Sequence, residues 1–477
     1  MVGYILLGLF GLLLAVLLIR AALFRPKAQE EIPWEEIPFD RDAAVHALQQ
    51  LVRCKTISCN DPEQEDEVEF EKLQALLPQL YPAVFKVCTL QRFPGRALLF
   101  RWPGKATTDP TVLMAHYDVV SVDEESWEKP PFDGIIEDGV LWGRGTLDTK
   151  VTVNGILSAA DRLITDGFQP ENDIYFAFSG GEEVNGPGAR NIVGWFLSEK
   201  ITPALVVDEG GAVVENVFPG VKAACGMIGI AEKGMMNVRY TVHSGGGHAS
   251  APPVKSPIPT LANACRRILK HPFPMHITRP AAEMFDTLGR HAGFGLKLIF
   301  ANLWLFGPVL DLICRKSGGE LNALVRTTTA FTQMEGSTGR NVLPAQAHLI
   351  SNMRLNPADT VEAATARLKK VVNDPTVEIE VLESFQPSPI SETNCESWHK
   401  VAHAVSHTWP GCIVTPYLMV QCSDSRHYGQ LSNHVYRFSA MDLTAEERRS
   451  IHGNNEKIRL ECIARAVEFY LRLIRQC

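Results

Sequence analysis

Apolar runs and amphipathic segments alternate along the first half of the chain, and this alternation is the strongest constraint on its fold. Amphipathic segments with helical spacing occupy residues 151–168 and 187–200. Short runs typical of strands occupy residues 96–102, 111–120, 172–180 and 204–211. An alternation of strand and helix predicts an α/β layer with a mainly parallel sheet.

The pattern changes beyond residue 231. Strand-like and helix-like segments occupy residues 234–253, 257–271, 322–336, 347–357, 359–374 and 375–384. They predict a smaller α+β domain with a ferredoxin-like arrangement. We therefore expect a larger domain in two parts, 42–231 and 385–477, with residues 232–384 inserted between them. A chain of 477 residues is long enough for such an organisation.

The N-terminus carries a long uncharged stretch. Residues 2–19 contain no charged side chain, and about 20 apolar residues match the thickness of a bilayer core. A cleaved signal peptide is the alternative. No Lys or Arg precedes the stretch, and no clear cleavage site follows it. We therefore expect residues 1–27 to be an uncleaved transmembrane anchor, followed by an acidic linker over 28–41.

The side of the membrane stays open. Arg20, Arg25 and Lys27 follow the apolar stretch, and the positive-inside rule would place the body of the protein in the cytoplasm. The acidic linker that comes next weakens this prediction.

Composition excludes several classes of function. The formal net charge is −8, and no run of Lys or Arg is longer than a pair, so nucleic-acid binding is not expected. The 11 cysteines include no CxxC pair, which argues against a disulfide framework and a structural zinc module.

Histidine and acidic residues follow the predicted strands. His116 and Asp118 stand at alternate positions, so their side chains can meet, and a carboxylate that orients a ligating imidazole is usual at zinc sites. Asp148 follows the glycine-rich turn GRGT, where a helix N-cap is the alternative role. Beside a metal, the adjacent acids Glu182 and Glu183 can take different roles: one binds the metal, and the other accepts a proton from metal-bound water.

A shared position strengthens this interpretation. Ligands bind at the carboxyl ends of strands in open α/β sheets, and His116, Glu182, Glu183 and Asp208 all fall there. The expected ligands are His116, Asp148, Glu183, Asp208 and His452. Five ligands are too many for one catalytic zinc and suit two metals with a shared carboxylate. Mixed imidazole and carboxylate ligation favours two Zn²⁺, with Co²⁺ or Mn²⁺ as alternatives.

The motifs together resemble a known family, the dizinc metallopeptidases that include aminoacylases, carboxypeptidase G-type enzymes and carboxypeptidase S. The motifs are HYD, GRGTLDTK, GGEEV, VDEGG and a late HGNNE. Narrower signals at 231–237, 245–253, 301–308, 323–332 and 339–344 are similar to the branch of N-fatty-acyl-amino-acid synthase/hydrolases and yeast carboxypeptidase S. The resemblance covers essentially the whole chain after the apolar N-terminus.

The resemblance implies a role for each metal-site residue. Asp148 would bridge two zinc ions, His116 and Asp208 would complete one site, and Glu183 and His452 the other. Glu182 would be the general base, and Asp118 would orient His116.

The resemblance also implies residues that contact the substrate. His248 of the inserted domain would stabilise the oxyanion, in many relatives from the partner subunit, so the inserted domain is expected to be a lid and to form a homodimer. Asn341, Arg354 and Arg426 would hold the substrate carboxylate. The chain reads SNMR at 351–354, where many relatives have an acidic residue before the Arg.

The expected function is zinc-dependent cleavage, and also formation, of the amide bond of N-acyl amino acids. A dipeptidase or carboxypeptidase acting on short peptides is the alternative. A membrane-tethered binding protein without chemistry is a third, and the intact Glu182–Glu183 pair argues against it. The apolar segment 293–316 is either core of the second domain or a wall for a long acyl chain.

Overall fold

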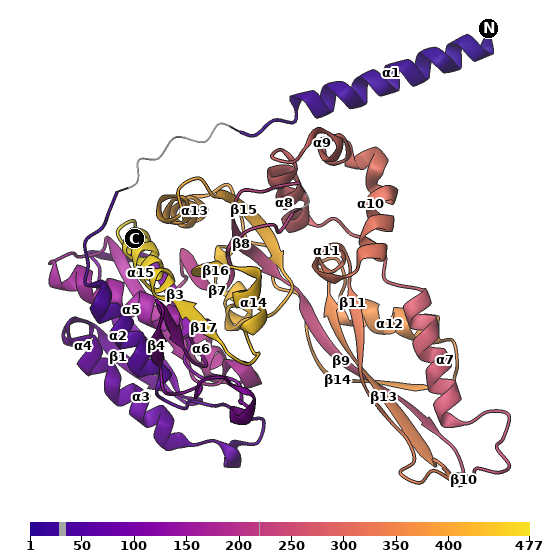
Figure 1. Cartoon of the computed structure of the whole chain (residues 1–477), viewed down its shortest axis with the longest axis horizontal. Helices are drawn as coiled ribbons and strands as arrows, with labels where there is room; N and C mark the ends of the chain where they lie inside the picture. Colours follow the sequence, from indigo (N-terminus) through magenta and orange to yellow (C-terminus); the bar gives the residue numbers. More distant parts are fainter. Residues whose placement is uncertain (28–34, 219) are drawn as a thin grey trace.

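The computed structural model contains two large sheets, which lie in two separate domains (Figure 1). It describes residues 1–27, 35–218 and 220–477. Half of the linker predicted at 28–41 therefore lies outside the described residues.

The larger domain is built on an eight-stranded sheet with the order β1-β2-β6-β3-β7-β16-β8-β15. Its central strands β6, β3, β7 and β16 run parallel, and so do β8 and β15. The α/β class predicted from the sequence is confirmed. The strands are β1 (Thr89–Phe93), β2 (Ala97–Trp102), β3 (Ala106–His116), β6 (Asn172–Ser179), β7 (Leu205–Val214), β8 (Cys225–Glu232), β15 (Ile413–Met419) and β16 (Val435–Leu443).

Helices cover both faces of this sheet. Apolar residues of α2, α5, α13 and α15 join the largest core on one face, and α6 packs on the other with Ile192, Val193 and Phe196. Both faces of the central strands are therefore buried, as expected of a parallel sheet. The helices of this domain are α2 (Arg41–Val52), α3 (Glu67–Leu80), α4 (Pro82–Val87), α5 (Lys150–Thr165), α6 (Gly188–Glu199), α13 (Glu396–Thr408), α14 (Ala445–Ser450) and α15 (Leu460–Ile474).

A small three-stranded sheet closes one end of the larger domain. Its strands are β4 (Ile135–Glu137), β5 (Val140–Trp142) and β17 (Lys457–Arg459). The sequence predicted a single helix over 457–476. Its first residues instead pair with β5, because the backbone of Lys457 to Arg459 meets a free strand edge there.

The smaller domain has a four-stranded antiparallel sheet with the order β11-β13-β9-β14. Two helices, α7 and α12, pack against it around Met236, Leu261 and Leu368. The connectivity is βαββαβ, the predicted ferredoxin-like arrangement. The elements are β9 (Gly234–His243), α7 (Pro257–Lys270), β11 (Thr328–Glu335), β13 (Gln346–Leu355), α12 (Val361–Val372) and β14 (Glu378–Phe385); β10 (Gly247–His248) pairs with β12 (Val342–Leu343) at the tip.

A helical segment interrupts the smaller domain between α7 and β11. It comprises α8 (Arg279–Gly289), α9 (Phe294–Phe300), α10 (Leu303–Ser317) and α11 (Gly319–Val325). Helix α8 packs against the edge strand β15, and Phe285, Leu310 and Cys314 belong to the core of the larger domain. Part of the expected inserted domain is thus packed on the larger sheet. The strand expected over 322–336 is helical up to Val325.

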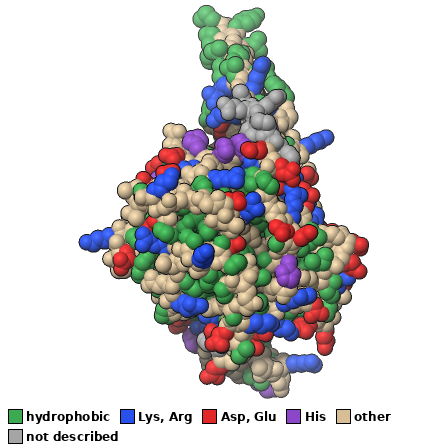
Figure 2. All heavy atoms as spheres, turned by 90° about the vertical axis from the view of Figure 1, so that its left-hand side faces the viewer, with side chains coloured by type: hydrophobic (Ala, Val, Ile, Leu, Met, Phe, Trp, Pro, Cys, Tyr) green, Lys and Arg blue, Asp and Glu red, His purple; other side chains and the backbone are tan. Residues whose placement is uncertain are grey.

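Helix α1 (Val2–Leu23) projects from the molecule beside α9 (Figure 1). Hydrophobic side chains cover most of the projecting end, whereas charged and polar side chains are mixed over the body (Figure 2). Among the described residues, α1 alone is a single helix long and apolar enough to cross a membrane, and the bent pair α9–α10 passes the same test when taken together. A signal sequence has the same properties.

Gly211 permits the close approach of β7 to its neighbours. A Cβ atom at this position would lie 1.7 Å from the backbone oxygen of Met227, so the backbone would have to shift. We expect Gly211→Ala to lower the free energy of unfolding by about 1–3 kcal/mol, the usual range for overpacking. Gly194, in the exposed middle of α6, has no atom within 4 Å of such a Cβ.

Gly194→Ala is the matched control, and we expect it to stabilise the fold by about 0.5–1 kcal/mol because alanine favours helix. Denaturant unfolding of the two variants measures both effects. Equal stability of Gly211→Ala and the wild type would contradict the close packing of β7.

Candidate metal centre

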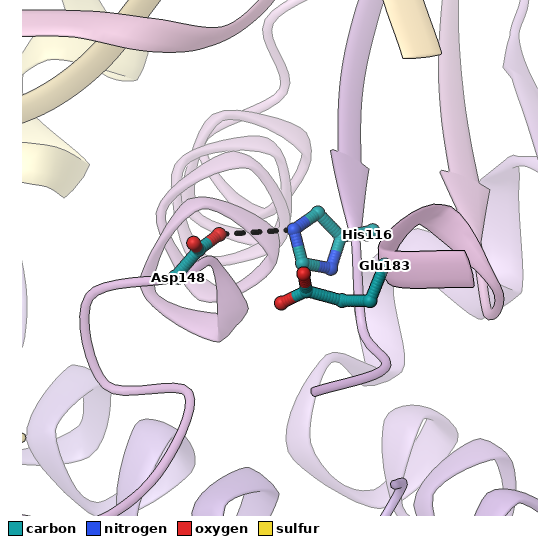
Figure 3. Close-up of side chains that lie close together, drawn as sticks. All are labelled: His116, Asp148 and Glu183. Carbon is teal, nitrogen blue, oxygen red and sulfur yellow. Dashed lines mark hydrogen bonds and ion pairs between the residues drawn. The ribbon is translucent and has the colours of Figure 1, made fainter. Parts of the chain in front are cut away.

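The candidate metal centre lies where the parallel strands β3 and β6 end, beside β7. His116 is the last residue of β3, and Glu183 lies in the short 3₁₀ helix η3 (Glu182–Val184) that follows β6. Asp148 lies in the loop two residues before α5 (Figure 3). The side chains of His116, Asp148 and Glu183 point toward one another from these three elements (Figure 3), and their ligand atoms lie within 4.8 Å of one another.

Asp148 lies between the two histidines. Its Oδ1 is 3.0 Å from Nε2 of His116, and its Oδ2 is 3.0 Å from Nε2 of His452. The same nitrogen of His452 lies 3.1 Å from Oε2 of Glu183. Each oxygen of this carboxylate therefore contacts a different imidazole. A carboxylate that two metal ions share needs this arrangement.

Glu209 occupies the position at which the sequence predicted Asp208. Oε1 of Glu209 lies 3.5 Å from Nε2 of His116, and Glu209 forms a second group with His116 and Glu182 that could hold a metal. Oδ2 of Asp208 instead accepts a hydrogen bond of 2.9 Å from the backbone of Ser425. Adjacent residues of a strand point to opposite faces, so only one of the two acids can face His116.

Asp118 binds the backbone around the two adjacent acids. Its oxygens accept hydrogen bonds from the backbone N–H groups of Glu182 and Glu183, at 3.1 and 3.2 Å, and from the hydroxyl of Ser58 at 2.7 Å. Oδ1 of Asp118 also lies 3.4 Å from Nδ1 of His116. This buried carboxylate thus positions the histidine and the loop that carries both acids.

Glu456 is a further positioning residue that the sequence analysis missed. It is fully buried, and Oε2 accepts a hydrogen bond of 2.6 Å from Arg144. Its other oxygen accepts a 2.7 Å bond from the backbone of Leu147, next to Asp148. Glu456 therefore fixes the turn before Asp148 to the loop that carries His452. Its position in the HGNNE motif, four residues after His452, was the sequence signal that could have identified it.

The charges of the site favour cations. Asp148, Glu182, Glu183 and Glu209 are grouped with two imidazoles, and within the described residues no Lys or Arg forms an ion pair with any of the four carboxylates. Buried carboxylates need a counter-charge or a proton. Imidazole and carboxylate donors together are the usual ligands of zinc and similar divalent ions. The residues present therefore fit a pair of such metals.

The pKa values reflect this crowding. Burial and the nearby charge of Glu209 raise the pKa of Glu182 well above its ordinary value, although His116 opposes the shift. Burial favours neutral His116, but the charge of Glu209 and hydrogen bonds to the surrounding carboxylates outweigh it and raise its pKa. Hydrogen bonds that His452 donates to Asp148 and Glu183 raise its pKa to about 10. A carboxyl with a raised pKa is suited to exchange protons near neutral pH.

Two of the predicted substrate-binding residues lie between the domains. Arg426 follows β15, and its guanidinium donates 3.0 Å to Oδ1 of Asn185, two residues after Glu183. Arg354 of β13 contacts Sγ of Cys422 at 3.1 Å. Arg354 of the smaller domain therefore contacts the loop 421–426 of the larger domain, and Arg426 is part of that loop.

The other two predicted residues lie elsewhere. His248 belongs to β10, at the tip of the smaller domain that is most distant from the larger domain (Figure 1). Asn341 is its neighbour, because the backbone oxygen of Asn341 accepts a 2.9 Å hydrogen bond from Ala249. The structure thus brings His248 and Asn341 together but separates them from the metal centre of the same chain.

The fold and the site define a metal-dependent hydrolase, with imidazoles and carboxylates gathered at the strand ends of an α/β sheet. The chain belongs to the peptidase family M20/M25/M40, whose model matches residues 112–476. This assignment confirms the family expected from the sequence motifs.

Similar proteins come from several organisms. An N-fatty-acyl-amino acid synthase/hydrolase of Xenopus tropicalis is 36% identical over 97% of this chain and 92% of its own length. A probable carboxypeptidase S-like protein of Dictyostelium discoideum is 33% identical over 98% of this chain and 92% of its own. The fold matches a metallo-carboxypeptidase of Sulfolobus solfataricus with a TM-score of 0.66, at 17% identity, over 91% of this chain and 98% of that one.

A dinuclear metal-binding peptidase of Bacillus subtilis has the same fold. Its TM-score is 0.55 at 11% identity, and the match covers 91% of this chain and 98% of the other. That peptidase belongs to the M20 family, and the chain described here has two overlapping groups of residues that could each hold a metal ion.

Metal content will decide between Glu209 and Asp208 as ligands. We expect Glu209→Gln to lower the bound metal by about one ion per chain, because three protein ligands usually hold a catalytic zinc. Asp208→Asn should retain both ions, since an amide oxygen can still accept the hydrogen bond from Ser425. Elemental analysis of the purified proteins measures the difference. Loss of an ion from Asp208→Asn but not from Glu209→Gln would show that Asp208 is the ligand.

Proposed function

We propose that the chain hydrolyses the amide bond of N-acyl amino acids at a two-zinc centre. The observation that carries the proposal is the position of Asp148 between His116 and His452, with acids on both sides. The similarity to an N-fatty-acyl-amino acid synthase/hydrolase supports the substrate class. The same centre could catalyse the reverse reaction, because a catalyst accelerates both directions.

Asp148 is the ligand that the two zinc ions would share. His116 and Glu209 would complete one site, and Glu183 and His452 the other. Bound zinc ions would supply Lewis-acid polarisation of the substrate carbonyl and acidification of water. Co²⁺ and Mn²⁺ suit the same donors.

Glu182 is the proton carrier of the proposed reaction. Its carboxylate accepts a proton from the attacking water and later delivers that proton to the nitrogen of the leaving amine. Asp118 holds the backbone N–H groups of Glu182 and Glu183, and so keeps the proton carrier and the neighbouring ligand in register.

The substrate carboxylate would be held between the domains. Arg426 belongs to the loop 421–426, and Arg354 contacts Cys422 of the same loop. A guanidinium group binds a carboxylate with two parallel hydrogen bonds. A free carboxylate is common to N-acyl amino acids and to the C-termini of peptides. A dipeptidase or carboxypeptidase activity is therefore the second candidate, and the similarity to a carboxypeptidase S-like protein favours it.

We also propose that the protein works as a homodimer at a membrane. The tip with His248 and Asn341 would reach the metal centre of a second copy, where His248 would stabilise the oxyanion. Helix α1 would remain as a single-pass anchor, since its apolar length suits a bilayer.

A substrate panel tests the reaction type. We expect the zinc-loaded protein to cleave N-acyl amino acids faster than dipeptides, and Glu182→Gln to lower kcat roughly 100- to 10,000-fold because it removes the proton carrier. Elemental analysis should show that this variant keeps its metal. Faster cleavage of dipeptides would favour the second candidate. Wild-type turnover by Glu182→Gln would exclude Glu182 as the base.

Mixing two inactive variants tests the dimer. Glu182→Gln and His248→Ala should each be inactive alone, whereas an equal mixture of exchanged subunits should recover about one quarter of the wild-type activity, because half of the dimers are mixed and each has one intact site. A mixture of Glu182→Gln and Asp148→Asn is the control and should stay inactive, since both substitutions affect the same domain. No recovery in the first mixture would show that His248 does not act across subunits.

A further inference from the structure

Helices α9 and α10 expose an unusually apolar surface beside α1. The exposed members are Phe294, Trp304, Leu305, Val309, Leu312 and Ile313, with exposed fractions between 38% and 61%. Residues 305, 309, 312 and 313 of α10 follow a helical spacing, so they form one stripe. We call these six residues the α9–α10 face.

The opposite side of α10 is fixed to the body of the protein. Leu310 and Cys314 are buried in the core of the larger domain. Asp311, the one acid in α10, is ion-paired with Arg315 and with the buried Arg326. Because one side of α10 is bound in this way, the helix lies on the surface of the protein. Its apolar stripe faces outward and can contact a lipid surface or another protein.

Helix α1 docks at the bend between α9 and α10, where the two helices turn by 109°. The guanidinium of Arg20 donates hydrogen bonds of 2.8 and 3.1 Å to the backbone oxygen of Ala301. Asn302 is fully buried, accepts a 3.0 Å bond from Arg20 and donates a 3.2 Å bond to the backbone oxygen of Leu17. Polar side chains thus connect α1 to the bend.

The last turn of α1 is held by a second contact. The guanidinium of Arg290 lies over the ring of Phe24 at 4.5 Å and donates a 3.1 Å hydrogen bond to the backbone oxygen of Arg25. Leu17, Ala21 and Phe24 are buried, whereas the apolar residues nearer the N-terminus are exposed. Helix α1 therefore leaves the body of the protein beside the α9–α10 face.

Basic side chains lie near the α9–α10 face. Lys297 lies in α9, Arg315 and Lys316 lie in the last turn of α10, and Lys27 follows α1. Basic side chains around an apolar face attract anionic lipid headgroups, and a tryptophan at the border of such a face is typical of the membrane interface.

We infer that the α9–α10 face lies in the headgroup and acyl boundary of the same bilayer that holds α1. The inference rests on the proposed membrane anchor. The face makes a second, interfacial contact, so that the body of the protein lies against the lipid surface. An amphiphilic N-acyl amino acid dissolved in that surface would then be at the same boundary as the protein.

Fluorescence of Trp304 tests the contact in the full chain. Wild type and Trp304→Phe are reconstituted into vesicles of phosphatidylcholine and phosphatidylserine, and the difference of their emission spectra isolates Trp304. We expect brominated acyl chains to reduce this difference roughly two-fold or more, and aqueous iodide to leave it nearly unchanged, since the indole lies at the interface. Trp195 of α6, which packs on Phe93 and Tyr175, is the control. Its difference spectrum, from Trp195→Phe, should not respond to bromine.

Other outcomes would overturn the inference. Quenching of Trp304 by iodide and not by bromine would place the face in water. Protection from both quenchers would place it against a second copy of the chain. A chain that does not float with the vesicles would contradict the anchor itself, and the inference with it. None of these readings requires turnover, so a failure of the proposed hydrolase activity is detected separately.

A kinetic comparison adds an independent test. Leu312→Ser with Ile313→Ser should lower the rate several-fold for a long-chain N-acyl amino acid dissolved in vesicles, and should leave the rate for soluble N-acetyl amino acids unchanged. Leu197→Ser, at an exposed leucine of α6, is the matched control and should change neither rate. Equal losses for both substrates would mean that the two residues act through packing, and would overturn the inference.

Discussion

Four carboxylates crowded against two imidazoles form the interaction on which the rest of the structure depends. Asp148 touches both histidines, and Glu182 and Glu209 lie partly buried close to His116. Desolvated like charges cost several kcal/mol each unless cations or protons neutralise them. Such a cluster persists only where rigid elements hold it. Here β3, β6 and β7 supply that rigidity, because their paired backbones are buried on both faces of the sheet.

The cluster also joins two distant parts of the sequence. His452 completes it after the whole inserted domain, and Glu456 fixes the same loop to the turn before Asp148. The buried pair of Arg144 and Glu456 strengthens this link. Binding of metal ions at this cluster would therefore also strengthen the link between the two sequence parts of the larger domain. The inserted domain can vary its position relative to the substrate without changing the ligands, since none of the proposed ligands lies in it.

The sequence predicted the parallel strands and most of the residues that the structure groups at the candidate site, because periodicity and acids after apolar runs are local signals. It could not choose between Asp208 and Glu209, which are adjacent on β7, since the neighbouring strands decide which acid faces His116. It assigned 322–325 to a strand, although long-range packing makes these residues helical. It also placed α8 in the inserted domain, whereas β15 supplies the surface on which that helix packs.

The helical segment α8–α11 gives the site a fixed relation to its surroundings. Helix α8 packs on β15 of the catalytic sheet, and α9 packs on α1. The sheet that carries the candidate metal centre is thus connected to the apolar N-terminus through packed helices. A single anchor limits the distance of a domain from a bilayer but leaves its orientation free. A second contact through α9 and α10 would fix the orientation as well, and the candidate metal centre would then keep a constant position relative to lipid-dissolved substrates.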